Sequence, residues 1–212
     1  MSKEKVLNTI FQTKVIAVIR MSDSEKLLKV IEAVQAGGVR AIEITMTTPD
    51  AIDVIKAMAK NKPQDVVIGA GSVLDSETAR IAILSGAEFV VSPVTNYEMI
   101  KVCNRYTIPV FPGAFTPTEI VSAWQIGADI VKVFPATSIG PTYFKDIKGP
   151  LPHIKIMPTG GVNLDNAKDF IMNGACCVGI GTALLDKKAI ETNDWNTLTE
   201  NAKKLIASLA NI

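Results

Sequence analysis

The sequence predicts an α/β fold in which a compact (β/α)8 TIM barrel occupies the whole chain, residues 1–212, as a single domain. Eight short apolar runs rich in β-forming residues recur along the chain, and helical stretches separate them. Four of these runs follow a helical stretch that ends in a small residue and a glycine. No linker, low-complexity segment or block of charge divides the chain. These observations favour one strand-and-helix unit repeated around a closed sheet.

The expected strands are spaced so that a helix fits between each strand and the next. They cover residues 15–19, 39–45, 66–70, 88–92, 108–112, 129–134, 154–159 and 177–180. Four glycines suit helix C-caps, where a left-handed residue ends a helix before the next strand begins. They are Gly38, Gly86, Gly127 and Gly174.

The stretch EKLLKVIEAVQAG, between the first two strands, is typical of an amphipathic helix because its apolar residues recur with helical spacing. Ser22 or Asp23 is expected to cap its start. After Asp186, a polar stretch and a final helix are expected to cover the barrel as a terminal element.

The strict alternation of strands and helices implies parallel strands joined by right-handed crossovers. Eight such units close into a barrel at the short end of the known size range. An open, doubly wound sheet is the alternative. However, the G-x-G-x-x-G pattern that a dinucleotide site requires does not follow the first strand.

The composition is that of a globular chain with little net charge. Apolar residues make up 48% of it, and no run of about 18 apolar residues suggests a membrane span. The 22 basic and 21 acidic residues give a net charge of +1, which provides no general attraction for nucleic acid or an anionic membrane. The first residues lack the apolar core of a secretion signal, so we expect a cytoplasmic protein without a membrane or nucleic-acid partner.

The cysteines form neither a disulfide framework nor a set with metal-ligand spacing. Cys176 and Cys177 are adjacent in an apolar run, and Cys103 lies in a predicted helix. We therefore expect three reduced packing residues, and neither a metal nor a cofactor.

Three charged side chains interrupt strands that a parallel barrel buries on both faces, namely Glu43, Lys132 and Lys155. Lys155 precedes Gly160 by five residues, which places it about 16 Å below the carboxyl end of its strand, where its amine can reach water. Lys132 and Glu43 lie near the carboxyl ends of their strands, where barrel enzymes place their chemistry. The alternation of side chains along a strand allows both to point inward.

A buried lysine and glutamate allow two interpretations. One is an ion pair that stabilises the barrel, although such pairs gain little over apolar packing. The other is catalytic, because burial lowers the pKa of Lys132 and its neutral amine can then attack a ketone to form a Schiff base. In that case Glu43 would carry protons to and from the reacting atoms, directly or through one water.

Two glycine-rich turns follow the last two strands, PTGGVNLDNA and GIGTALL. In this fold the loops after strands seven and eight commonly bind phosphate through backbone N–H groups. Gly160 and Gly161 allow an anion to approach the backbone closely, while Gly181 and Thr182 offer an amide and a hydroxyl. The alternative is a tight turn in which Asn163 caps the next helix.

The chain resembles the bacterial 2-keto-3-deoxy-6-phosphogluconate (KDPG) and 4-hydroxy-2-oxoglutarate (KHG) aldolases over nearly its whole length. The motifs that carry the resemblance are GGVRAIEIT, GAGSVL, VVSP, IPVFPGAFTPTE, VKVFPA and PTGGV, in this order. The resemblance implies a class I aldolase in which Lys132 forms the imine with the 2-keto carbon and Glu43 is the general acid and base. It implies that Ser72 contacts the pyruvoyl carboxylate. It further implies a pocket lined by Pro93, Phe134 and Thr159, with Gly160, Gly161 and Thr182 at the phosphate end.

The implied reaction is the reversible cleavage of KDPG to pyruvate and glyceraldehyde 3-phosphate, a lyase step of Entner–Doudoroff carbohydrate metabolism. The partner is then a small 2-keto acid, the implied assembly is a homotrimer, and no metal takes part. KHG and 2-keto-3-deoxy-6-phosphogalactonate are alternative substrates, because residue types do not resolve their stereochemistry.

The sequence departs from the family pattern at Thr47. Well-known members carry an arginine there, two residues after the threonine of the E-x-T motif, and it helps to bind the substrate carboxylate. Arg20 closes the neighbouring first strand, and we hypothesise that its bidentate guanidinium replaces the missing cation. The alternative is that Arg20 simply meets solvent at the strand end.

Two other functions remain open from the residues alone. A phosphosugar isomerase or epimerase would use the same phosphate loops but needs a carboxylate or histidine base. The sole histidine, His153, precedes strand seven and is expected at the opposite end of the barrel. A binding protein that has lost its chemistry is the second alternative, and the presence of both Lys132 and Glu43 argues against it.

Overall fold

The computed structural model describes residues 1–21, 23–210 and 212. The strands are β1 (Val15–Ile19), β2 (Ala41–Thr45), β3 (Val67–Gly71), β4 (Phe89–Val91), β5 (Val110–Phe111), β6 (Gly113–Ala114), β7 (Val131–Val133), β8 (Ile156–Pro158) and β9 (Val178–Ile180). The helices are α1 (Lys3–Thr13), α2 (Ser24–Ala36), α3 (Ala51–Asn61), α4 (Ser76–Leu84), α5 (Tyr97–Arg105), α6 (Pro117–Gln125), α7 (Gly140–Lys148), α8 (Ala167–Met172), α9 (Lys187–Glu191) and α10 (Trp195–Leu209), with a 3-10 turn η1 (Ala136–Ser138).

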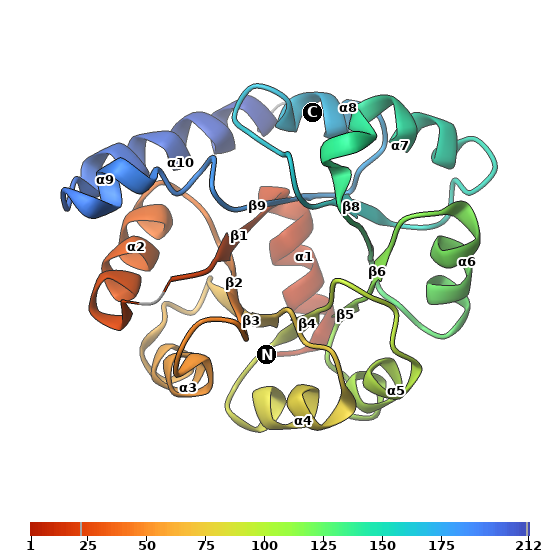
Figure 1. Cartoon of the computed structure of the whole chain (residues 1–212), viewed down its shortest axis with the longest axis horizontal. Coiled ribbons are helices and arrows are strands. Elements are labelled where there is room, and N and C mark those ends of the chain that lie inside the picture. The colour runs from red at the N-terminus through yellow and green to blue at the C-terminus, as the bar shows by residue number, and fades with distance from the viewer. Residues whose placement is uncertain (22, 211) are drawn as a thin grey trace.

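The strands are all parallel and curl into a barrel that the helices surround, which confirms the predicted (β/α)8 fold (Figure 1). One sheet has the order β5-β4-β3-β2-β1-β9 and the other β6-β7-β8. A bridge between Thr159 and Gly179 joins β8 to β9, and the chain itself joins β5 to β6. Below, the end of the barrel at the carboxyl ends of the strands is called the upper end, and the opposite end the lower end.

The fifth expected strand, residues 108–112, is the one that the structure corrects. It is divided into β5 and β6 on either side of Pro112. Proline has no N–H to donate to the ladder, so the regular pairing stops there. The carbonyl of Pro112 still accepts the N–H of Lys132 at 2.9 Å, which keeps the two halves beside β7.

Helix ends follow the predicted chemistry. The four C-cap glycines all have positive φ, namely Gly38 (101°), Gly86 (106°), Gly127 (101°) and Gly174 (100°). At the start of α2, the carboxylate of Asp23 accepts the N–H of Lys26 at 3.0 Å. Ser22, the other expected cap, lies outside the described residues.

The lower half of the barrel interior is filled by apolar side chains and closed by α1, which the sequence reading had not identified. Val6 and Ile10 of α1 are buried against the inward side chains of the strands. Phe89 and Phe111 stack among them with ring centroids 5.6 Å apart. Figure 1 shows α1 in the middle of the ring of strands. The interior is therefore accessible from the upper end.

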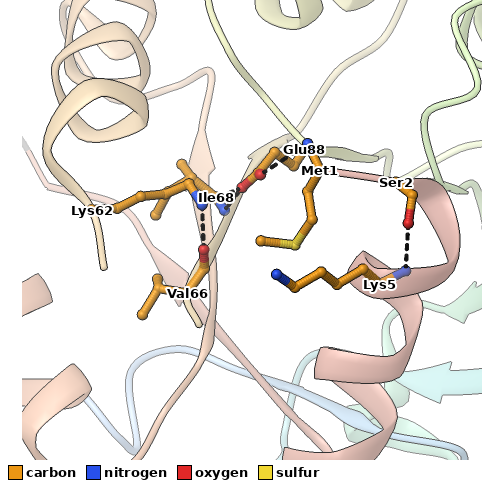
Figure 2. A network of polar contacts seen from close by, with 7 residues as sticks. All are labelled: Met1, Ser2, Lys5, Lys62, Val66, Ile68 and Glu88. Carbon is orange, nitrogen blue, oxygen red and sulfur yellow. Dashed lines mark hydrogen bonds and ion pairs between the residues drawn. The ribbon is translucent and has the colours of Figure 1, made fainter. Parts of the chain in front are cut away.

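Polar contacts at the lower end tie the beginning of the chain to β3 and β4 (Figure 2). The carboxylate of Glu88 accepts the N–H of Ile68 at 3.1 Å and lies 3.1 Å from Nζ of Lys62. The other carboxylate oxygen of Glu88 lies 3.9 Å from the amine of Met1. Nζ of Lys62 also donates to the carbonyl of Val66 at 2.5 Å. Each charge in this group has partners.

The positions of Lys155 and the three cysteines can be compared with the expectations from the sequence. Lys155 is exposed, and its amine lies 5.6 Å from the ring centroid of Phe11 on α1. Cys103, Cys176 and Cys177 are free thiols, and two of them are fully buried. Among the described helices, none combines the length and apolar character that a bilayer span requires.

Candidate active site

Lys132 occupies the middle of β7 and points into the barrel. Its backbone is held between β6 and β8, where it pairs with Gly113 on one side and Met157 on the other. The residue is 4% exposed, and its amine lies 4.9 Å from the ring centroid of Phe134. A cation over an aromatic face is stabilised by the ring, so Phe134 gives this amine one favourable contact when it is charged.

Glu43 occupies the corresponding height on β2, on the other side of the barrel interior. The register sets it beside Val18 of β1 and Gly69 of β3. It is 1% exposed, and its Oε2 atom has no hydrogen-bond partner among the described residues. A fully buried carboxylate oxygen without a partner is costly, and such groups concentrate at functional sites.

The two charged groups influence each other across the interior. Burial raises the pKa of Glu43, while the charges of Lys132 and Arg20 oppose that rise. Burial lowers the pKa of Lys132, the charge of Glu43 opposes this, and Arg20 adds to it. Lys132 and Glu43 form no ion pair within 4.0 Å in the described part of the chain. The arrangement thus provides an amine that loses its proton more readily than an ordinary lysine and a carboxyl group that keeps its proton more readily than an ordinary glutamate.

A cavity of about 880 Å³ opens at the upper end, and Phe134, whose ring lies 4.9 Å from the amine of Lys132, is in its wall. Lys132 and Glu43 themselves are not part of its lining. Of the candidate residues, the cavity brings together Arg20, Phe134, Thr159, Gly160, Gly161, Gly181 and Thr182. It is large enough for a sugar-sized ligand. Arg20 follows β1 directly and is exposed to solvent, so the guanidinium belongs to the cavity wall and not to the barrel core. Its charge still reaches both buried groups.

The glycine-rich turn after β8 contains the tight turn expected at Asn163, but Asn163 does not cap the next helix, because the N-cap of α8 is Asn166. Gly160 and Gly161 both have positive φ, 86° and 75°, which glycine adopts without strain. Asn163 indeed forms a turn, because its side-chain oxygen accepts the N–H groups of Asp165 and Asn166, each at 2.9 Å. The turn leaves both glycines on the cavity wall.

The other candidate residues lie at the upper ends of neighbouring strands but outside the lining of this cavity. Ser72 follows β3 with a positive φ of 56° and is half-buried. Pro93 follows β4, and its backbone lies against Gly113 of β6. The hydroxyl of Thr47 lies 3.0 Å from that of Thr45 and is exposed to solvent.

Thr159 lies between the cavity and the barrel interior. It lines the cavity and is 8% exposed. Its hydroxyl is buried without a partner in the described residues and packs against the Cα of Gly179. A side chain on Gly179 would displace it.

Sequence reasoning missed two lysines on the cavity wall, Lys26 and Lys187. Nζ of Lys26 donates to the carbonyls of Ile190 and Glu191 at 3.1 and 3.3 Å, so it ties α2 to α9. The position of Lys26, in the first turn of the helix after strand one, was a usable signal. Lys187 begins a short helix in a polar tail, where nothing local marks it as a cavity residue.

The described residues contain no group of three or more His, Cys, Asp or Glu side chains placed to hold a metal ion. His153 lies exposed in the turn before β8, at the lower end, with its ring centroid 6.2 Å from that of Trp124. It lies far along the barrel from the pair of Lys132 and Glu43. The buried titratable side chains at the upper end are Glu43 and Lys132, while Asp23 and Glu191 lie on the cavity wall.

Comparison with known proteins gives consistent matches. The family model described as "Aldolase: KDPG and KHG aldolase" matches residues 6–201. The chain is 31% identical to a 2-dehydro-3-deoxy-phosphogluconate aldolase of Haemophilus influenzae over 204 residues, 96% of each chain. It is 32% identical to the KHG/KDPG aldolase of Escherichia coli K12, which covers 97% of this chain and 95% of that one.

A solved structure agrees with these sequence matches. The KDPG aldolase of Legionella pneumophila, captured with pyruvate as a covalent carbinolamine intermediate, superposes with a TM-score of 0.86 at 30% identity. The superposition covers 93% of this chain and 96% of the other. The likeness therefore extends over nearly the whole chain.

Proposed function

Because the chain belongs to the KDPG and KHG aldolase family, we propose that it reversibly cleaves KDPG to pyruvate and glyceraldehyde 3-phosphate through a Schiff base on Lys132. The chain is an aldolase, a lyase that breaks a carbon–carbon bond. The observation that carries the proposal is a buried amine of lowered pKa on the inward face of β7, whose charge interacts with a buried carboxyl group of raised pKa on β2.

The reaction begins when the neutral amine of Lys132 adds to the C2 ketone to form a carbinolamine. Glu43 gives its proton to the carbinolamine hydroxyl, which leaves as water, so that a protonated imine and a carboxylate remain. Glu43 takes the proton of the C4 hydroxyl, directly or through one water, and the C3–C4 bond breaks. The electron pair of that bond moves to the imine nitrogen and forms an enamine, while the C4 carbon leaves as the aldehyde. Protonation of the enamine at C3 and hydrolysis by water release pyruvate and restore the amine.

The two ends of the substrate are held by different parts of the cavity in this proposal. The phosphate lies at the glycine turns, with Gly160, Gly161 and Gly181 presenting backbone and Thr182 its hydroxyl. Arg20 supplies the positive charge that binds the substrate carboxylate, because Thr47, which stands in place of the family arginine, carries no charge. Support comes from the position of Arg20 on the same cavity wall as Phe134 and from the effect of its charge on the pKa values of Lys132 and Glu43.

Trapping the imine tests the mechanism. The protein is incubated with pyruvate, reduced with borohydride and mapped by peptide mass spectrometry, and the label is expected on Lys132. Lys155 is a matched internal control, since it directly precedes β8 at the lower end. A protein that cleaves KDPG yet carries no label on Lys132 would contradict the Schiff base.

Substrate preference is tested by the ratio of kcat/KM for KDPG, 2-keto-3-deoxy-6-phosphogalactonate and KHG. The cavity wall carries a glycine turn of positive φ, and its three cations, Arg20, Lys26 and Lys187, outnumber its two carboxylates, Asp23 and Glu191, which favours a phosphorylated substrate. We therefore expect KHG to be the slowest of the three. A preference for KHG would place the chain with that activity instead.

We also propose that the protein works as a homotrimer in the cytoplasm, in Entner–Doudoroff carbohydrate metabolism. Support for self-association is a group of exposed apolar side chains on or beside α4 and α5. They are Leu74, Ile81, Leu84, Val94 and Tyr97. Sedimentation of the protein and of a Leu84→Glu variant tests the assembly: a trimer that the variant weakens supports it, and a monomeric parent protein excludes it.

A further inference from the structure

We propose that Gly71 is a positioning residue for Glu43: because it has no side chain, the carboxyl group can occupy the one place from which it serves Lys132. This inference rests on the proposed function. Gly71 ends β3 and neighbours Thr45 of β2 in the parallel register. It is the second glycine of the GAGSVL motif.

The inward face of β3 is almost bare. Val67 belongs to the core inside the barrel, whereas Ile68 and Ala70 belong to the core between the sheet and the helices. Alternation along the strand therefore turns Gly69 and Gly71 inward as well. The two inward positions nearest the upper end lack side chains, and side chains from the strands on either side fill the space.

Those neighbouring side chains are Phe89 and Glu43. A Cβ atom on Gly69 would meet the ring of Phe89 closer than 3.0 Å, and a Cβ on Gly71 would meet Oε1, Cδ and Cγ of Glu43 equally closely. Gly71 does not have a positive φ, so its backbone is one that alanine can adopt. The requirement for glycine at this position is therefore one of space and not of backbone conformation.

Packing matters more than usual here because hydrogen bonds do not fix the carboxylate. Oε2 of Glu43 has no partner among the described residues, and the side chain is 99% buried. The surface against which it rests is the Cα of Gly71. A methyl group there would push the carboxyl group off its place, with Phe89 filling the interior below it.

The Gly71→Ala variant tests the inference, because it should slow the reaction steps that need Glu43 and leave intact the step that needs only Lys132. Displacing a reacting group by about 1 Å can cost about a hundredfold in rate. We expect kcat for KDPG cleavage to fall by about that factor with KM changed little. The exchange of pyruvate C3 protons for deuterium should fall equally, and the pH dependence of kcat should shift. Borohydride should still trap pyruvate on Lys132.

Gly69→Ala is the matched control. It adds the same methyl group to the same inward face of β3, but against Phe89. We expect it to lower thermal stability while the pH dependence of kcat stays that of the parent. If both variants changed kcat and its pH dependence alike, Gly71 would be an ordinary packing residue.

A double-mutant cycle covers the case in which Gly71→Ala folds poorly. In the Glu43→Ala background the carboxyl group is gone and the new methyl group has room, so Gly71→Ala should cost little stability there. Equal loss of melting temperature in both backgrounds would overturn the inference. Absence of pyruvate labelling in the parent protein would instead reject the proposed function, so the two failures are distinguishable.

Discussion

Two pairs of lysine and glutamate lie at opposite ends of the same barrel and differ in their partners. At the lower end, Glu88 accepts a backbone N–H and contacts Lys62, which itself donates to a carbonyl. At the upper end, Glu43 has a carboxylate oxygen without a partner, and its distance from Lys132 exceeds that of an ion pair. The residue types are the same, and only the surroundings differ.

The number of hydrogen-bond partners thus distinguishes buried charges that stabilise the fold from buried charges that are available for a reaction. A buried charge with all its hydrogen bonds is accommodated, whereas one without them shifts its pKa towards the neutral form. The pKa shifts of Glu43 and Lys132 both go in that direction. Replacing one residue of the upper pair should therefore mainly lower activity. Replacing one residue of the lower pair should mainly lower the stability of the fold.

The largest expected effect is that of Lys132→Met, which removes the proposed nucleophile. Cleavage of KDPG should fall by about a thousandfold or more, and no pyruvate should be trapped. Because an apolar chain of similar volume replaces a desolvated amine, and Glu43 can take up a proton once the opposing charge is gone, the free energy of unfolding should change little. Urea unfolding and a coupled cleavage assay measure the two effects. A clear loss of stability would mean that Lys132 also supports the fold.

Glu43→Gln keeps the shape of the side chain and removes its ability to exchange a proton. We expect kcat to fall by about a hundredfold to ten-thousandfold, the usual contribution of a general acid and base. Imine trapping on Lys132 should persist, although more slowly. Single-turnover measurements with KDPG resolve the two steps, and normal cleavage by this variant would assign the proton transfer to another group.

Arg20→Ala should weaken binding of the keto acid. We expect KM to rise by about tenfold to a hundredfold, equivalent to about 1.4 to 3 kcal/mol. Arg20→Lys should recover only part of this, because an ammonium group cannot form the bidentate contact. Steady-state kinetics measures all three proteins. If KM is unchanged in the alanine variant, Arg20 merely meets solvent at the end of β1.

The pH dependence of imine formation provides a smaller effect with a defined sign. Only the neutral amine reacts, so the rate rises as pH rises through the pKa of Lys132, which burial lowers from the ordinary lysine value. Arg20 lowers this pKa further, so Arg20→Ala should move the rise in rate to higher pH. Borohydride trapping at a series of pH values measures it. A move to lower pH would contradict the electrostatic assignment.

The smallest effect on activity is expected for Lys62→Met at the lower end. The variant leaves Glu88 without its lysine, which should lower the free energy of unfolding by about 1 to 3 kcal/mol. The value of kcat/KM should stay that of the parent protein, because the upper end is untouched. A loss of activity without loss of stability would show that the two ends are coupled.

The fold could be predicted from the sequence because each unit carries its own local signals. Glycines such as Gly38 end helices with positive φ wherever they stand, and tertiary structure does not alter that preference. The division of the fifth strand at Pro112 was equally a local property, but the prediction ignored it. Helix α1 was missed because Val6 and Ile10 face the interior of a barrel that the first residues alone do not indicate.

The site was predictable in part for a physical reason. Lys132 and Glu43 stood out because a charge inside an apolar strand is rare and needs an explanation. Lys187 gave no such signal, since lysine is ordinary in a polar tail. The contact between Gly71 and Glu43 required knowledge of which neighbouring side chain leans over which strand, and only the register between β2 and β3 provides that.

The closure of the lower end by α1 determines the order in which the products can leave. With the lower end filled by Val6, Ile10 and the phenylalanine stack, substrate and products share one entrance. After bond cleavage the three-carbon enamine is still attached to Lys132 at the inner end, and the phosphorylated aldehyde lies between it and the solvent. The aldehyde must therefore depart first and pyruvate second. Pyruvate should inhibit cleavage competitively with KDPG, and glyceraldehyde 3-phosphate should inhibit it in a mixed manner.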